Sequence, residues 1–183
     1  TDDLEIAEIA GSFGAEIPFM RPENLSDDQT TTIPVINHAI KWLQEQGIHP
    51  KLACCIYATA PFVLPEDIIN GLKQLQKNKD DFAFTVTSYA FPIQRAININ
   101  SDNLISMFSP EEFSTRSQDL KKAYHDAGQF YWGKTEAWLE ERMVFGPRST
   151  PIIIPRHRVQ DIDTHEDWVR AEWLFKAMEV EKN

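Results

Sequence analysis

The chain has 183 residues, 42% of them hydrophobic and 11% aromatic, and its formal net charge is −10. This length and apolar content predict a single folded domain over residues 1–183 and exclude a disordered chain. The negative charge argues against nucleic-acid or membrane-surface binding, and no apolar run reaches the ~20 residues that span a bilayer.

The first half of the chain alternates between helical and strand patterns. The first predicted helix is capped by Asp2 or Asp3, carries Ile6, Ile9, Ala10 and Phe13 on one face and ends at Gly14. A second helix has Thr32 as its cap and stops at Gly47. An apolar strand over 51–58, a helix from about Glu66 and a strand over 82–87 follow. The run 51–58 is typical of a central strand covered on both faces. This alternation predicts an α/β fold with a largely parallel sheet.

The second half of the chain has a different pattern of predicted elements. The predicted elements are a hairpin with strands 95–99 and 104–107, a short strand over 130–132, a short helix over 135–142, an apolar strand over 151–155, and a last helix with Trp168, Ala171, Phe175 and Met178 on its apolar face. Residues 109–129 are long, polar and without a clear period. We interpret them as a functional loop or as an arm that packs on a partner.

The two cysteines, Cys54 and Cys55, are adjacent inside the apolar run. Neighbours on a strand point to opposite faces, so this pair is unsuited to a disulfide. We expect buried structural thiols, which fit a reduced, cytoplasmic setting.

The stretch Asp161-Ile162-Asp163-Thr164 is the first candidate site. If it ends a strand, both aspartates point the same way, roughly 7 Å apart, and can share a hard cation, while Ile162 points into the core. Thr164 and Asp167 form a capping-box pattern for the last helix. The alternative is that the aspartates only start that helix.

Polar residues also follow the predicted strands, where ligands bind in open α/β sheets. They are Tyr57 to Pro61 after the first strand, Thr87 to Tyr89 with Gln94 and Arg95 after the next, the aspartate pair, and Arg21 and Thr30 to Thr32 from loops that could reach the same edge. Magnesium prefers one or two carboxylates completed by phosphates and waters. A two-aspartate site therefore suggests a nucleotide di- or triphosphate.

Several segments resemble one enzyme family. Gly14-Ala15-Glu16-Ile17-Pro18-Phe19-Met20-Arg21-Pro22, Ala58-Thr59-Ala60-Pro61 and Asp161-Ile162-Asp163-Thr164 are similar to the bacterial cytidylyltransferases that activate nonulosonic acids. Tyr57 to Phe62, Phe130 to Lys134 and Gln160 to Trp168 look closest to the pseudaminic acid branch. The sialic acid branch usually has Gln-Pro-Thr-Ser-Pro where Tyr57 to Pro61 stands.

The resemblance implies a three-layer, Rossmann-like nucleotidyltransferase fold with a mixed, mostly parallel sheet. It implies a cytoplasmic homodimer that joins the anomeric hydroxyl of a nine-carbon sugar acid to the α-phosphate of CTP, with Mg²⁺ as cofactor and release of pyrophosphate. Asp161 and Asp163 match the family's catalytic metal ligands. The positions that match substrate-binding segments are Arg21 and Thr31 near the nucleotide and Tyr57, Thr59, Gln94, Arg95, Arg116 and Gln129 near the sugar acid, with Arg116 in the 109–129 region that forms the dimer arm.

One departure leaves alternatives open. The family begins with a strand and a basic, glycine-containing loop around the triphosphate, and Thr1 starts after both, so the domain is expected to lack its first strand and phosphate loop. Tyr57 in place of the sialic-branch glutamine leaves the sugar open. The alternatives are a CMP-sialic acid synthetase, a sugar-nucleotide transferase with an Asp-x-Asp metal site, and a catalytically silent nucleotide-binding or assembly subunit.

Overall fold

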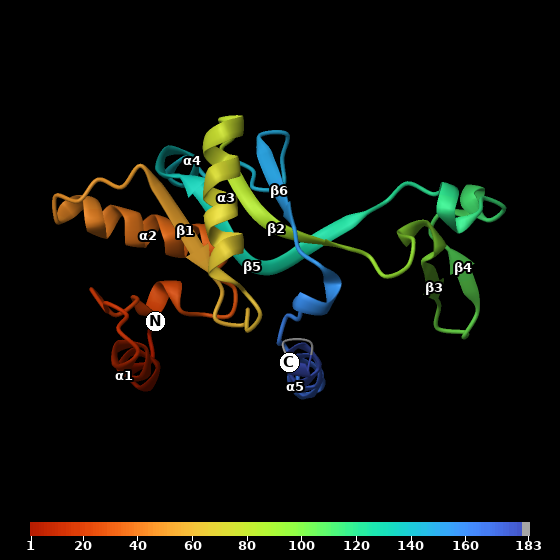
Figure 1. Cartoon of the computed structure of the whole chain (residues 1–183), viewed down its shortest axis with the longest axis horizontal. Helices are drawn as coiled ribbons and strands as arrows, with labels where there is room; N and C mark the ends of the chain where they lie inside the picture. The colour runs from red at the N-terminus through yellow and green to blue at the C-terminus, as the bar shows by residue number, and fades with distance from the viewer. Residues whose placement is uncertain (181–183) are drawn as a thin grey trace. The chain divides into compact units, whose positions relative to one another are not determined.

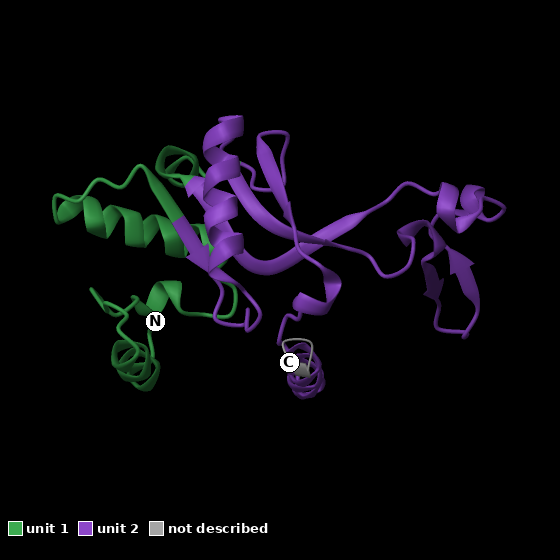
Figure 2. Cartoon of the chain, viewed as in Figure 1, with its two compact units in different colours: residues 1–53, 134–142 green, residues 54–133, 143–183 purple. Residues whose placement is uncertain are grey.

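The computed structural model describes residues 1–180 and contains two compact units. Unit 1 consists of Thr1–Ala53 and Lys134–Arg142, and unit 2 consists of Cys54–Gly133 and Met143–Asn183. Figure 2 shows the two units in different colours. None of the helices in the described part of the chain is long and apolar enough to cross a membrane.

Unit 1 is mainly helical. It contains α1 (Leu4–Ser12), η1 (Glu23–Leu25), α2 (Thr32–Glu45), α4 (Thr135–Leu139) and the first residues of β1 (Leu52–Ile56). The predicted cap of α1 is confirmed, because Asp3 Oδ1 accepts a hydrogen bond from the Ile6 amide at 2.9 Å. Gly14 follows the helix at φ +91°, a conformation that favours glycine. Only Ala7 is buried among the residues of α1, so the apolar face predicted for it is largely in solvent.

Helix α2 begins one residue earlier than predicted, with Thr31 rather than Thr32 at its N-cap. Its buried positions Ile36 and Ile40 lie one turn apart, the spacing that places side chains on one face. α2 packs against α4, where Trp138 is buried and donates from its indole nitrogen to the Ala53 carbonyl at 3.4 Å. The predicted short helix over 135–142 is thus confirmed, although it ends at Leu139.

A four-stranded sheet has the order β1-β5-β2-β6. Its strands are β1, β2 (Phe82–Ser88), β5 (Tyr124–Lys134) and β6 (Ser149–Ile153). β2 pairs antiparallel with β5 and parallel with β6, so the sheet is mixed, as predicted, but it is not mostly parallel. The reason is the connection between β2 and β5. The chain leaves β2 through a hairpin arm, and after the arm β5 runs back beside β2 in the opposite direction.

The interior strands of the sheet are β5 and β2, and β1 is not one of them. Every residue from Phe82 to Thr87 is buried, whereas β1 lies at the end of the strand order and Ile56 is 51% exposed. The prediction of a central strand over 51–58 is therefore wrong. An apolar run shows that side chains are covered, but it does not say how many neighbouring strands a segment has.

Helix α3 (Pro65–Asn78) covers β2 and β6. Pro65 opens it, a position where the missing N–H costs nothing, and Lys79 ends it in the left-handed region at φ 58°. Leu75 is buried, and the Trp132 indole donates to the Ile68 carbonyl at 2.9 Å. The helix is thereby fixed to β5 as well.

Strand β5 is longer than predicted and contains a bulge. Phe84 is opposite Tyr131, but Val86 is opposite Asp126, so three extra residues of β5 are accommodated between the two pairs. Gly128 lies in this bulge at φ +60°. The bulge interrupts the period of the strand, which is why the sequence predicted only a short strand over 130–132 and assigned 124–129 to a polar segment.

The segment between β2 and β5 is an arm that lies beyond the ends of both strands (Figure 1). It contains η2 (Ile93–Arg95), β3 (Ile97–Ile99), β4 (Ile105–Met107), η3 (Pro110–Glu112) and η4 (Ser117–Asp119). β3 and β4 form the predicted antiparallel hairpin. Asn100 Oδ1 closes its turn by accepting from the Leu104 amide at 2.9 Å.

The C-terminal part contains η5 (Arg156–Arg158) and α5 (His165–Val180). The predicted capping box is confirmed: Asp167 N donates to Thr164 Oγ1 at 3.2 Å, and Thr164 N donates to Asp167 Oδ2 at 2.9 Å. The prediction that Asp161 and Asp163 end a strand is wrong. Strand β6 stops at Ile153, and Pro155, which has no N–H for a ladder, leads into the 3₁₀ turn of η5.

Candidate functional site

A cavity of about 340 Å³ lies at the carboxyl end of β2. It is bordered by residues of β2, of the first half of β5, of the segment from η5 to Asp161, and of α5. The lining residues are Thr87, Ser88, Ala90, His125, Asp126, Ala127, Arg156, Val159, Gln160, Asp161 and Arg170. The structure thus brings one predicted metal ligand, Asp161, to the end of β2, where the sequence placed a ligand site.

Asp161 packs against the bulge of β5. A Cβ added at Gly128 would lie 3.5 Å from Asp161 Oδ2, and Gly128 adopts a backbone conformation that side chains rarely take. Asp161 Oδ1 accepts a hydrogen bond from the Ile162 amide at 3.1 Å. The bulge, with glycine at position 128, therefore lets the backbone of β5 pass close to the Asp161 carboxylate.

Ile162 lines a different cavity from its neighbour. This cavity, of about 350 Å³, is apolar and is also lined by Pro61, Phe62 and Trp168. Ile162 is half-buried and is not part of the buried core, and the strand alternation used to predict its inward direction is absent. Asp163 is exposed, and its amide donates to Asp167 Oδ2 at 3.3 Å.

A cluster of two tyrosines and an aspartate lies beside the bulge. The Tyr131 hydroxyl donates to Asp126 Oδ2, and Asp126 Oδ1 accepts from the Gly128 amide at 3.0 Å. Burial, followed by the hydrogen bond to Asp126, raises the pKa of the Tyr131 hydroxyl far above its usual value. The ring of Tyr57, a predicted sugar-acid residue, lies 5.3 Å from that of Tyr131. These contacts fix the shape of β5 where it borders the first cavity.

Gln129 is 2% exposed and connects β5 to η5. Its Nε2 donates to the Arg158 carbonyl at 2.6 Å, and its backbone amide donates to Thr85 Oγ1 at 3.3 Å. Its Oε1 is buried and accepts no hydrogen bond within the described residues. Arg158 in turn forms a two-pronged ion pair with Asp67 of α3, with nitrogen–oxygen distances of 2.6 and 3.3 Å.

Three other predicted sugar-acid residues lie in the arm. Gln94 donates to the Lys121 carbonyl at 3.1 Å, Arg95 donates to the Thr115 carbonyl at 2.5 Å, and Arg116 pairs with Asp119 at 2.8 Å. None of the three lines the cavity that contains Asp161.

The remaining predicted positions also lie outside that cavity. Thr59 is half-buried in the turn after β1. Arg21 pairs with Asp2 at 2.5 Å and Thr31 precedes α2, both within unit 1.

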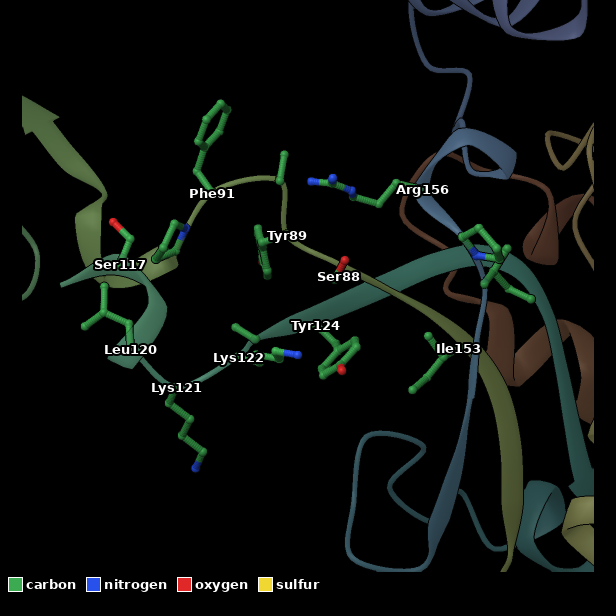
Figure 3. A pocket seen from close by; sticks show the side chains of 15 residues that line it. Ser88, Tyr89, Phe91, Ser117, Leu120, Lys121, Lys122, Tyr124, Ile153 and Arg156 are labelled. Carbon is green, nitrogen blue, oxygen red and sulfur yellow. The ribbon is translucent and has the colours of Figure 1, made fainter. Parts of the chain in front are cut away.

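A second cavity, of about 470 Å³, shares Ser88, Ala90 and Arg156 with the first. Figure 3 shows Arg156 extending its guanidinium group toward the segment between Tyr89 and Phe91, while Lys122 and Tyr124 come from the chain that leads into β5 and Lys121 points away. Sequence reasoning missed Arg156 and Arg170. The available signal was the basic run Arg156-His157-Arg158 directly before the aspartate pair.

Asp161 and Asp163 offer exposed carboxylate oxygens, the type of ligand that a hard cation prefers. In the described part of the chain, no group of three His, Cys, Asp or Glu residues could hold a metal ion by itself. The two carboxylates are exposed and only one residue lies between them. Mg²⁺ typically takes one or two carboxylates from a protein when phosphates complete its coordination.

Comparisons with known proteins agree on one family. Residues 1–173 match the family described as Cytidylyltransferase. The chain is 43% identical over 177 residues to the pseudaminic acid cytidylyltransferase of Campylobacter jejuni, covering 97% of this chain and 76% of that protein. It is 25% identical over 172 residues to the N-acylneuraminate cytidylyltransferase of Escherichia coli, covering 93% and 40%.

A solved structure shares the fold. The structure of CMP:2-keto-3-deoxy-manno-octonic acid synthetase in complex with CTP superposes with a TM-score of 0.64 at 11% identity, covering 97% of this chain and 79% of that one. At this identity the likeness shows the fold alone.

Proposed function

Because the chain belongs to the cytidylyltransferase family, we propose that it transfers CMP from CTP to pseudaminic acid or a close nonulosonic acid and releases pyrophosphate. The observation that carries the proposal is the 43% identity to a pseudaminic acid cytidylyltransferase, which extends over 97% of the chain. The match to the sialic acid relative is lower, at 25%, which favours the pseudaminic acid substrate over the sialic acid alternative.

In the proposed reaction the anomeric hydroxyl of the sugar acid attacks the α-phosphorus of CTP. A bond forms between that oxygen and phosphorus, the bond from the α-phosphorus to the bridging oxygen breaks, pyrophosphate leaves, and the hydroxyl loses its proton. Catalysis of such a transfer is mainly a matter of position and charge. We infer that the cavity beside Asp161 is where both are supplied, because its walls carry carboxylates, guanidinium groups and hydroxyls at the end of the sheet.

We propose Mg²⁺ as the cofactor, with Asp161 and Asp163 as its protein ligands. When bound, the ion would neutralise charge on the phosphates of CTP. The chain contributes the position of the ligands: Ile162 lines the apolar cavity beside Phe62, and the capping box at Thr164 fixes the start of α5. Both carboxylates lie in the short loop between η5 and α5.

The test is pyrophosphate release by the full-length protein with CTP, pseudaminic acid and Mg²⁺. Asp161→Asn and Asp163→Asn should each lower the rate at least about 100-fold, because removal of a charged group that stabilises a transition state typically has this effect. Asp102→Asn, an exposed aspartate in the hairpin turn, is the matched control and should retain activity. Unchanged turnover in both aspartate variants would remove the metal assignment, and no pyrophosphate release by the unaltered protein with any nonulosonic acid would remove the function.

A homodimer that forms through the arm is part of the proposal. The support is the apolar surface of this arm in unit 2, where Phe108, Phe113 and Ile105 are about 70% exposed. Apolar side chains gathered on one projecting segment are typical of a protein interface. A cytoplasmic location follows from the proposed reaction, because CTP is supplied there.

Sedimentation of the purified protein tests the dimer. Ile105→Asp with Phe108→Asp should shift the protein to monomer, because charges are costly in an apolar interface. Phe13→Asp, a change at a still more exposed phenylalanine outside the arm, should leave the mass unaltered. A monomeric unaltered protein would contradict the proposal.

A further inference from the structure

Two arginines at the candidate site have no side-chain partner among residues 1–180. In unit 2, Arg148 and Arg158 form ion pairs with aspartates of the same unit, and Arg95 donates to a backbone carbonyl. Arg156 and Arg170 form no ion pair or side-chain hydrogen bond with any residue of the described chain, and both line the cavity that contains Asp161. A guanidinium group without an anionic partner at a cavity wall is suited to bind an anion.

The segment that carries Arg156 is held from two directions. Gln129 binds the Arg158 carbonyl from β5, and Asp67 binds the Arg158 side chain from α3. The Arg158 and Asp67 side chains are each only 18% exposed, so this ion pair is shielded from solvent. The backbone of η5 is therefore fixed, and Arg156 is presented to the cavity from a rigid support.

Arg156 also stands where the two cavities meet. It lines both of them, together with Ser88 and Ala90. The first cavity contains Asp161, and the larger one, drawn in Figure 3, contains Lys122 and Tyr124. A ligand that reaches from Asp161 into the larger cavity passes this guanidinium group.

The charges in the cavity indicate where an acidic group would bind. Asp126 and Asp161 both line the first cavity. Their negative charges would repel the carboxylate of a ligand unless a cation lay between that carboxylate and the aspartates. Arg156 and Arg170 are the arginines of that cavity's lining. A carboxylate would consequently bind beside these two residues.

We propose that Arg156, with Arg170 beside it, binds the carboxylate of the acceptor sugar acid and makes the enzyme select an acidic sugar. The inference rests on the proposed function and assigns a specificity-determining contact within it. The fork of a guanidinium group matches the two oxygens of a carboxylate, which a neutral side chain cannot do. The larger cavity beyond Arg156, with its tyrosine and serine hydroxyls, would take the remainder of the sugar.

The experiment compares Arg156→Gln, Arg156→Lys and the unaltered full-length protein in pyrophosphate release. For Arg156→Gln we expect the KM for the sugar acid to rise about 10- to 100-fold, the range for a lost charge-assisted hydrogen bond, while the KM for CTP changes less than about 3-fold. Arg156→Lys should recover part of the loss, because it keeps the charge but not the fork. Lys73→Gln, which removes an exposed positive charge from α3, is the matched control and should behave like the unaltered protein.

A second measurement separates this contact from a loss of structure. The carboxamide of the sugar acid should be a poorer substrate than the acid for the unaltered protein, and Arg156→Gln should accept acid and amide almost equally. A variant that merely folds poorly would lose both substrates in proportion.

The outcomes are distinguishable. An active unaltered protein with an unchanged KM for the sugar acid in Arg156→Gln overturns the inference and leaves the proposed function intact. A raised KM for CTP alone would reassign Arg156 to the triphosphate and also overturns it. An inactive unaltered protein refutes the proposed function, and binding of the sugar acid measured by calorimetry then decides the inference by the same acid-to-amide comparison.

Discussion

Gly71 of α3 is the position where a single methyl group should be most costly. It is buried, and a Cβ built on its backbone would lie 2.7 Å from Phe130 Cε2 and 3.0 Å from Trp132 Cδ1. Phe130 is fully buried, and Trp132 is held by its hydrogen bond to the Ile68 carbonyl. Neither ring can move away easily, so Gly71→Ala must shift α3 or distort β5.

The magnitude follows from two opposing contributions. Overpacking of a filled core costs about 1–3 kcal/mol, and the 2.7 Å approach to a ring that cannot move away places Gly71→Ala in the upper part of that range, at about 2–3 kcal/mol. Alanine in place of glycine in a helix interior returns about 1 kcal/mol. The expected net effect is a loss of about 1–2 kcal/mol in the free energy of unfolding, which for a chain of this size is about 2–8 °C in Tm.

Gly11 of α1 provides the matched control, because nothing lies within 4 Å of a Cβ added there. Gly11→Ala should keep or slightly raise stability, by up to about 1 kcal/mol. Urea denaturation followed by far-UV circular dichroism measures both variants, with unchanged m-values as the check on two-state behaviour. Gly71→Ala with stability equal to or above that of the unaltered protein would refute the packing of α3 on Phe130.

Two further predictions concern the last helix and the thiols. Thr164→Ala should lower the free energy of unfolding by about 1 kcal/mol through loss of the N-cap, whereas Thr164→Ser should retain most of it. The hydrogen bond from the Thr164 hydroxyl holds the pKa of the Asp167 carboxyl below its usual range. The stabilisation from this hydrogen bond is therefore present above the unfolded-state pKa of Asp167 and is lost as pH falls. The difference in unfolding free energy between Thr164→Ala and the unaltered protein, measured by denaturation, should shrink in acid. Burial raises the pKa of the Cys54 thiol to about 12 and that of the Cys55 thiol to about 11. Alkylation of both thiols at pH 8, followed by mass spectrometry, should therefore be at least about 100-fold slower than alkylation of a free cysteine. Labelling at the rate of a free cysteine would contradict the burial of these thiols. Because these pKa values are raised, the neutral thiols stabilise the fold below the unfolded-state pKa, and this contribution is lost as pH rises above it.

Local sequence signals were reliable for the ends of elements. The cap at Asp3, the glycine after α1 and the capping box of α5 were all predicted and are all present. Each depends on contacts between residues fewer than five positions apart, which the sequence displays directly. The β3–β4 hairpin belongs to the same class, because the turn residues lie between the strands that they connect.

Contacts between distant segments were predicted less well. The apolar run of β1 resembled that of an interior strand, and nothing local distinguishes an edge strand from a central one. The direction of β5 depends on how the arm returns, and its bulge depends on the pairing with β2. Strand order and orientation are decided by the packing of the whole sheet.

The sequence by itself determined the α/β class, the resemblance to nonulosonic acid cytidylyltransferases and the choice of Asp161 and Asp163, because motifs and caps are local patterns. Only the tertiary structure showed that Asp161 faces Gly128 in the bulge of β5 and shares a cavity with Arg156. Arg156 stands between a proline and a histidine in a short 3₁₀ turn, and its neighbour Arg158 looks the same in the sequence. The difference is that α3 delivers Asp67 to Arg158 and brings no partner to Arg156, and that pairing is fixed by the fold across 91 residues of sequence.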